Sequence, residues 1–308
     1  MDKCPPELHA YICQLTCIDD GQTIRSINQT SRYFYHVSKP YLYRNLYISG
    51  PKQIHAISGL LETSSKAYLR HIRHLFISDA ACATENHGPL LTAVPETHTL
   101  ILRIISSAAP TLESLTLIAY SPQQSTSLIA RLFRISFPRL RNLTISGFYP
   151  FPTSAGKFPR LERLHLNGNR NPHGLLQMSI LENTCPSLEF LTVSGLGSAA
   201  SFVMEIKEAM GNRGTEIEDP VLLFPAKFPA RLRQVILQAG PKVVREGIDL
   251  LKDRLMMKSL EGLKMETNQT NGVPQVIVLD RSPEPTIVYD TIKQEWFENI
   301  VTFTSQDY

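Results

Sequence analysis

One stretch of the chain has the residue types and spacing of a nucleotide-binding turn. The segment TVSGLGSAASFVMEIKEAM places Gly195, Gly197 and Ala200 in the pattern Gly-x-Gly-x-x-Ala, between a strand-like and a helix-like sequence. Such glycines let a pyrophosphate approach a helix N-terminus, and Glu216 and Glu218 follow about 20 residues on, where an acidic residue can bind a ribose. Similar glycines follow other strands of this chain, as ISG and NGN. We therefore interpret the turn as a repeat loop, and a dinucleotide-binding enzyme remains a remote alternative.

The other side chains with chemical potential form no set that points to catalysis. His71 and His74 have the spacing H-x-x-H, but no cysteine or acidic ligand set lies nearby, so we expect no metal site. The cysteines are odd in number and form no C-x-x-C pair; they are Cys4, Cys13, Cys17, Cys82 and Cys185. The sequence contains no GxSxG, HExxH or P-loop motif. We expect a protein that is not an enzyme and needs no cofactor.

Composition argues against several classes of partner. The 308 residues include 31 basic and 28 acidic ones, and a formal charge of +3 is too close to neutral to favour nucleic acid. No window approaches the length of apolar sequence that spans a bilayer, and the start MDKCPPELHA has no apolar signal core. We expect a cytoplasmic or nuclear protein with reduced cysteines that binds neither nucleic acid nor membrane.

A recurring Leu-x-x-Leu-x-Leu pattern predicts the elements that position these residues. Aligned on their second leucine, the repeats centre on Leu75, Leu115, Leu143, Leu164, Leu191, Val235 and Leu263. Their separations are 40, 28, 21, 27, 44 and 28 residues, and four of the six fall in the range of leucine-rich repeats. The alternation Leu-x-Leu indicates a strand with one buried face. We therefore predict a stack of strands in a parallel sheet, because no single repeat can bury its leucines alone.

Between the predicted strands the apolar period becomes helical. The residues at helical spacing are Leu128, Leu132 and Ile135; Leu176 and Ile180; and Val244, Ile248, Leu251 and Leu255. The short step around YPFPTSAGKFP is rich in Pro and Gly, so we predict irregular chain there. A Pro precedes several strands, where it turns the chain into the sheet, and the Phe or Cys before it can fill the core between turns.

The residues that flank the paired leucines should face away from the helices and form a concave surface. This row is small and polar, which suits recognition of a protein target. The candidate target-binding residues are Phe76, Thr116, Thr144, Arg163, His165, Asn167, Phe190, Thr192 and Gln234. Arg163 and His165 could favour an acidic group. The alternative is a solvated sheet face without a partner.

The first 45 or so residues predict a small helical cluster, which we call the head. Pro6 begins a helix whose apolar stripe comprises Leu8, Tyr11, Ile12 and Leu15. Asp20 is a candidate N-cap for the next helix. A second stripe, broken near Thr30–Ser31, comprises Ile24, Ile27, Phe34 and Val37. Leu46–Ile48 then predicts the first strand of the stack.

Together these residues resemble a known family. The string PPEL…I…L…DD…I…S-R-Y-F…PYLYRNLYI resembles an F-box of the kind that heads many fungal F-box proteins with leucine-rich repeats. The similarity extends through LRHIRHLFIS and the repeats, and it includes the tail TIVYDTIKQEWFENI, which is similar to the closing helix of those proteins. It therefore covers nearly the whole chain, and the order of the modules carries it more than any single motif.

The resemblance implies a substrate receptor of an SCF (Skp–cullin–F-box) ubiquitin ligase. The head would bind a Skp-type adaptor of the cullin ligase core, and the repeats would hold a protein target. The positions that match the family's adaptor contacts are Pro5, Pro6, Leu8, Ile12, Ile24 and Ile27. The alternative is that these residues only pack the helices of the head together.

The sequence also departs from the family pattern. Cys4 stands where Leu is usual before Pro, Tyr33–Phe34 stand near the usual Trp, and Asn28–Gln29 replace a more apolar pair. These departures motivate a second hypothesis, a repeat-based interaction scaffold that recruits no ligase.

The predicted fold class is α/β. Residues 1–45 would form the F-box-like helical head, and residues 46–300 an irregular leucine-rich-repeat solenoid with a parallel inner sheet, followed by a tail over residues 301–308. A C-terminal helix should seal the open end of the stack, since exposed strand edges and apolar surface are unfavourable. The residues proposed for this seal are Ile292, Trp296, Phe297 and Ile300.

Overall fold

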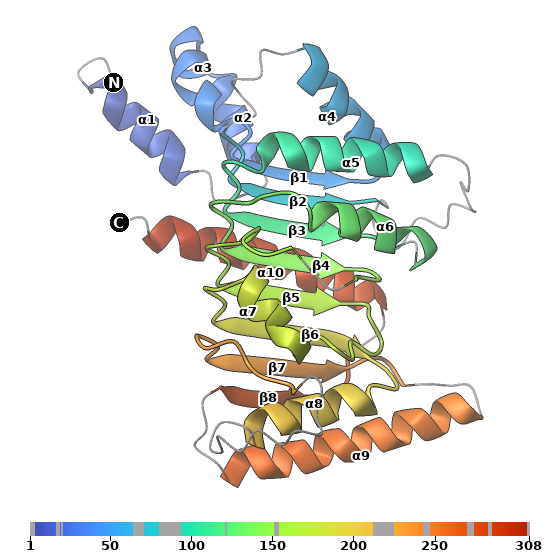
Figure 1. Cartoon of the computed structure of the whole chain (residues 1–308). Coiled ribbons are helices and arrows are strands. Elements are labelled where there is room, and N and C mark those ends of the chain that lie inside the picture. The colour runs from blue at the N-terminus through green and yellow to red at the C-terminus, as the bar shows by residue number, and fades with distance from the viewer. Residues whose placement is uncertain are drawn as a thin grey trace. The chain divides into compact units, whose positions relative to one another are not determined.

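The computed structural model has an α/β fold in which eight strands, in chain order, form one parallel sheet that alternates with helices (Figure 1). The structure describes residues 4–16, 19, 21–63, 71–79, 94–120, 122–150, 154–211, 225–242, 247–269, 274–282 and 285–306. Contacts divide the chain into a first unit, Met1–Ile118 with Thr286–Tyr308, and a second unit, Ala119–Pro285.

The strands lie where the leucine pattern predicts them, with one exception. The first unit contains β1 (Asn45–Ser49), β2 (His74–Ser78) and β3 (Ser114–Ile118). The second contains β4 (Asn142–Ser146), β5 (Arg163–Asn167), β6 (Phe190–Leu196), β7 (Gln234–Ala239) and β8 (Gln275–Leu279). The register aligns the repeated leucines: Leu46, Leu75 and Leu115 pair in the first unit, and Leu143, Leu164 and Leu191 in the second. Buried leucine columns therefore set the register, because a slip by one residue would turn each column outward.

The exception is the repeat predicted at Leu263, which was wrong. Leu263 lies in a long helix, α9 (Ile248–Gln269), where Met256, Leu260 and Leu263 form its buried stripe. The last strand, β8, instead comes from QVIVL, which pairs with β7. The apolar residues of LEGLKM fit the spacing of a strand and also that of a helix. The flanking sequence has helical spacing on both sides, and the segment therefore forms part of the helix.

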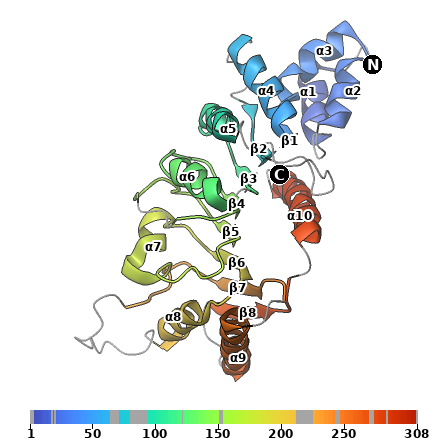
Figure 2. The same cartoon turned by 90° about the vertical axis from the view of Figure 1, so that its right-hand side faces the viewer.

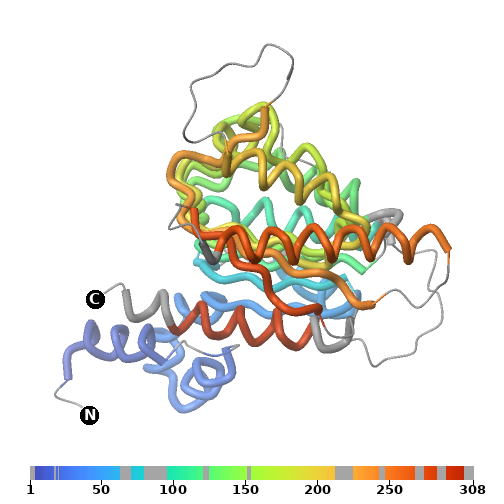
Figure 3. The backbone as a smooth tube through the Cα atoms, turned by 90° about the horizontal axis from the view of Figure 1, so that it is seen from below, coloured from blue at the N-terminus to red at the C-terminus, as the bar shows by residue number. Residues whose placement is uncertain are grey.

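The remaining helices follow the helical stretches of the sequence. In the first unit they are α1 (Pro6–Leu15), α2 (Gln22–Asn28), α3 (Arg32–Ser38), the 3-10 turn η1 (Lys39–Tyr41), α4 (Pro51–Thr63), α5 (Val94–Ala108) and α10 (Pro285–Gln306). In the second they are α6 (Pro122–Leu132), η3 (Gln177–Ser179), α7 (Ile180–Thr184), α8 (Ala200–Gly211) and α9, and α8 packs beside α9 (Figure 3). The helix predicted around Leu176 and Ile180 is short, because Met178 and Ser179 have left-handed backbone conformations. The chain over 148–150 and 154–162 is irregular as predicted, and 151–153 lie outside the described residues.

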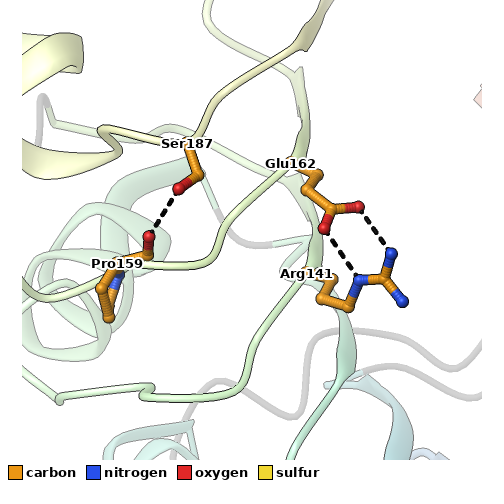
Figure 4. A network of polar contacts seen from close by, with 4 residues as sticks. All are labelled: Arg141, Pro159, Glu162 and Ser187. Carbon is orange, nitrogen blue, oxygen red and sulfur yellow. Dashed lines mark hydrogen bonds and ion pairs between the residues drawn. The ribbon is translucent and has the colours of Figure 1, made fainter. Parts of the chain in front are cut away.

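The turns that enter the strands are packed and cross-linked. Phe137, Phe158 and Cys185 are fully buried, and the first two rings stack 5.4 Å apart, which confirms that the residue before each Pro fills the core between turns. Arg141 donates from Nε and one Nη to the two carboxylate oxygens of Glu162 at 2.9 and 3.0 Å (Figure 4). In the next turn, Ser187 Oγ donates to the carbonyl of Pro159 at 2.8 Å (Figure 4).

The turns that leave the strands stack through glycine. Gly168 has φ +107°, and a Cβ there would lie 2.7 Å from the carbonyl oxygen of Gly147 in the preceding turn. Backbone from one turn therefore occupies the place of a side chain in the next, which only glycine allows. This close approach explains why ISG and NGN recur after the strands.

Helix α10 does not seal the end of the stack, which corrects the sequence prediction. Its Tyr289, Ile292, Trp296 and Ile300 instead form one buried cluster with Phe76 of β2 and Ile118 of β3. Within the first unit, α4 and α5 lie on one side of β1–β3 and α10 lies on the other (Figure 2). The sheet face there carries Phe76, and covering this ring removes more apolar surface from water than covering a polar strand would.

Candidate protein-binding surfaces

The head presents one face of α1 to solvent. Pro6 occupies the first turn of the helix, and His9 and Cys13 point inward and are buried. The opposite stripe is apolar yet open: Leu8 and Ile12 are each 50% exposed, and Tyr11 and Leu15 are exposed beside them. Single exposed apolar residues are ordinary, but four that share one helix face form a contiguous patch of the kind that marks interaction sites.

The neighbouring helix α3 extends this patch. α3 packs against both α1 and α2, so the three helices lie together (Figure 3). Tyr33 of α3 is exposed, and its hydroxyl lies 2.7 Å from Nδ1 of the buried His9. We call Leu8, Tyr11, Ile12, Leu15 and Tyr33 the head surface. Since the His9 contact orients Tyr33, this aromatic ring is held in place before any partner arrives.

The inner residues of the head form its own small core. Cys13 and Ile24 are each 1% exposed and pack with Ile27, Val37, Tyr41 and Leu42. Burial raises the pKa of the Cys13 thiol, in keeping with the prediction that it packs as a small apolar group. The Ser31 hydroxyl caps α3 by accepting from the amide of Phe34 at 3.2 Å. The predicted cap Asp20 lies outside the described residues, and Asp19 accepts from the amides of Gly21 and Thr23 before α2.

The predicted adaptor-binding residues therefore separate into two groups. Pro5, Pro6, Leu8 and Ile12 are exposed at the start and along the outer face of α1. Ile24 is instead in the core of the head and Ile27 is half-buried against it, so the expectation of Ile24 on a docking face needs correction. The exposed patch also contains Tyr11, Leu15 and Tyr33, which the sequence analysis did not put forward as adaptor-binding residues, although the stripe that contains Leu8 and Ile12 also contains the first two.

The second unit presents a sheet face. Helices α6 and α7 lie on one side of its strands, and no described helix of this unit covers the other side (Figure 2). We call the partly exposed residues on that side the open face: Thr144, Ser146, Arg163, His165, Asn167, Phe190, Thr192, Gln234, Ile236, Gln238, Gln275, Ile277 and Leu279. The predicted target-binding residues of β4–β7 all belong to it.

Polar pairs across strands organise the open face. The guanidinium of Arg163 lies over the ring of Phe190, 4.8 Å from its centroid. Nε2 of His165 lies 2.8 Å from the hydroxyl of Ser194, and the Asn167 amide donates to the Ser146 hydroxyl at 3.0 Å. These contacts join adjacent strands and fix the side chains of a surface that remains open to solvent.

Two predicted target-binding residues lie elsewhere. Phe76 is 0% exposed and lies beneath Trp296 of α10, and Thr116 is also buried. Neither side chain is open to a partner, which corrects their assignment to an exposed face. The sequence placed them on the correct side of their strands, but it gave no signal that α10 would cover that side.

The glycine turn before α8 is occupied by the neighbouring repeat. A Cβ on Gly195 would lie 2.6 Å from Oδ1 of Asn167, and one on Gly197 would lie 3.0 Å from Nε of Arg170. The Gly197 amide donates to the carbonyl of Arg170 at 2.8 Å. Contacts with the preceding repeat thus explain why both positions are glycine. They also occupy one of the amides that a pyrophosphate would need. Glu216 and Glu218 lie outside the described residues.

The two histidines that could suggest a metal differ in environment. His71 is exposed, whereas His74 is fully buried in β2. Burial, followed by the positive charges of Arg44 and Arg73, lowers the pKa of His74 to about 3. Within the ranges that the structure describes, no three His, Cys, Asp or Glu side chains are grouped to hold a metal ion, and no helix has the length and apolarity to cross a bilayer.

No protein-family model matches the chain, and no curated protein matches its sequence.

Proposed function

We propose that this protein is a substrate receptor of an SCF-type ubiquitin ligase. In this proposal α1–α3 form an F-box, the parallel strands and their helices form an irregular leucine-rich-repeat solenoid, and the open face holds a protein target that is not yet known. The head surface binds a Skp-type adaptor of the cullin ligase core. The protein would itself catalyse nothing and would work in the cytoplasm, the nucleus or both.

The mechanism would be tethering. An adaptor bound to the head brings the ligase to the same chain that holds the target. Ubiquitin transfer to target lysines then becomes effectively intramolecular, and the local concentration of acceptor sites rises without any new contact at the reacting atoms.

The observation that carries the proposal is the exposed stripe of α1. Leu8 and Ile12 expose half of their surface although the head has its own core around Cys13 and Ile24. These two residues are therefore not needed to pack the helices of the head together. A partner that covers them removes apolar area from water, which is worth about 25 cal/mol for each Å² buried.

Co-expression with a Skp-type adaptor, followed by affinity capture and size-exclusion chromatography, tests the proposal. We expect a one-to-one complex that is lost in the double variant Leu8→Asp/Ile12→Asp. Leu60→Asp is the matched control, because Leu60 is 42% exposed on α4, outside the head surface. Retention of the complex in a folded double variant, or its absence in the native chain, would contradict the proposal.

A repeat-based scaffold without ligase recruitment is the second candidate. Its basis is the set of departures in the head, notably Cys4 in place of the usual Leu and Tyr33–Phe34 near the usual Trp. It predicts a folded chain that ignores the adaptor. Robust ubiquitin transfer to a bound target in a reconstituted ligase would exclude it.

A further inference from the structure

The open face carries a single formal charge. Its residues are small, polar or apolar, and among those that the structure describes only Arg163 is charged. No Asp or Glu side chain belongs to the face. A partner that meets this surface therefore meets one fixed cation and no opposing carboxylate, and charge complementarity favours an anionic group on the partner.

The position of Arg163 is held by its neighbour on the next strand. Arg163 of β5 is in register with Phe190 of β6, and the guanidinium lies 4.8 Å from the centroid of that ring. A guanidinium on an aromatic face is weakly hydrated and keeps its N–H edge free to donate. Arg163 on Phe190 is thus arranged to bind a planar acceptor that can take two parallel hydrogen bonds, as a carboxylate does.

Within the described ranges, the carboxylates nearest Arg163 in the strand entrances are engaged elsewhere. The adjacent carboxylate, Glu162, accepts from Arg141 through both oxygens at 2.9 and 3.0 Å. The next carboxylate along the strand entrances, Glu189, pairs with Arg233. Arg163 is exposed, and within the described residues its guanidinium makes no ion pair and interacts with the ring of Phe190.

The surrounding polar groups pair with one another. His165 contacts Ser194, Asn167 donates to Ser146, and Gln234 donates to Gln275 at 3.4 Å. These pairs can accommodate a peptide backbone but do not select for charge. Selection for charge falls to Arg163.

We propose that the open face binds an acidic segment of the target protein, with an Asp or Glu carboxylate seated on Arg163 beside Phe190. The inference rests on the proposed function only in calling the bound segment a target. We choose a carboxylate over a phosphate because a phosphate carries about −1.5 to −2 charges and is usually met by a cluster of cations, whereas this face has one.

The experiment selects peptides from a random 12-residue display library on the immobilised full chain. We expect the selected pool to be enriched in Asp and Glu over the input library. A synthetic peptide from that pool should bind Arg163→Ala at least about tenfold more weakly, which corresponds to about 1.4 kcal/mol. Arg163→Lys should be intermediate, because lysine keeps the charge and loses the two-pronged geometry. Phe190→Ala should also weaken binding, since it removes the aromatic ring that holds the Arg163 guanidinium in place.

Arg139→Ala is the matched control, because Arg139 is exposed in the turn before β4 and lies outside the open face. This variant should bind as the native chain does, and equal unfolding midpoints would show that all variants are folded. Raising the salt concentration should weaken binding to the native chain more than to Arg163→Ala.

Three results would overturn the inference: a pool without acidic enrichment, no peptide that prefers the native chain to Arg163→Ala, or a clear gain in affinity when phosphoserine replaces the acidic residue. The outcome is separable from that of the proposed function. A chain that captures the adaptor but selects no acidic peptide contradicts this inference alone. A chain that selects acidic peptides but ignores the adaptor contradicts the ligase proposal alone.

Discussion

At the scale of single residues, Phe76 shows how far a local pattern can be trusted. Its alternation with Leu75 and Ile77 predicts its side of the strand correctly. The cover that it receives comes from Trp296, more than two hundred positions away in the sequence, with a ring-centroid distance of 5.7 Å. Nothing local to Phe76 encodes that contact, so sequence reasoning could not separate a buried ring from an exposed one.

Phe76→Ala tests this packing. Removing a fully buried ring from a cluster should lower the free energy of unfolding by about 3–5 kcal/mol, because both the transfer energy and the packing around the cavity are lost. Trp296 is the only tryptophan of the chain, so its fluorescence reports on the same cluster during urea unfolding. Phe148→Ala is the control, since Phe148 is exposed and its replacement should lower the free energy of unfolding only slightly. Equal small losses in the two variants would contradict the buried position of Phe76.

The buried His74 predicts a dependence of stability on pH. In the folded state it stays neutral down to about pH 3, whereas in the unfolded chain it binds a proton below about pH 6.5. Acid therefore favours unfolding, and this residue alone should remove about 2 kcal/mol of stability between pH 7 and pH 5.

Urea unfolding of the native chain and of His74→Gln at both pH values measures that contribution. The variant should lose less stability on acidification than the native chain, because glutamine does not titrate. An NMR titration of the imidazole gives a second measurement that needs no variant. A midpoint near pH 6.5 in the folded protein would contradict the account.

At the scale of elements, the strands that carry the leucine pattern were predictable, whereas the position of the last strand was not. Each strand from β2 to β7 carries two buried aliphatic residues at alternate positions, which indicates a strand with one buried face. LEGLKM and QVIVL show the limit, because the first satisfies two periods and the second lacks the leucine motif. The choice between them depends on the helical stripe of α9, which places Met256, Leu260 and Leu263 in the core.

The stacked turns give the prediction at this scale. Gly168→Ala should destabilise the protein by at least about 1–2 kcal/mol, because alanine strains a left-handed backbone and its Cβ would meet the carbonyl of Gly147. Gly59→Ala on α4 is the control: nothing lies within 4 Å of its Cβ position, and alanine favours the helix by up to about 1 kcal/mol. Chemical unfolding of the two variants should move in opposite directions. A neutral Gly168→Ala would show that the turns do not stack closely.

At the scale of the whole molecule, each half of the proposed function belongs to a different unit. The head surface lies in the first unit and the open face in the second. The apolar stripe of α1 was predictable from the sequence, because the helical spacing of its apolar residues is enough to define it. Ile24 was assigned to the same surface only through the resemblance to the F-box family. Its packing against Cys13 places it in the core of the head instead.

The most direct test of the central claim is a hydrogen-exchange footprint of the full chain with and without a Skp-type adaptor. We predict slower exchange of the α1 and α3 amides when the adaptor is present, since a partner on the head surface suppresses local opening of these helices. The amides of α9 and of β4–β7 should exchange at unchanged rates. Protection that appears only on the strands of the second unit, or no protection at saturating adaptor, would contradict the assignment of the head surface as the ligase-docking site.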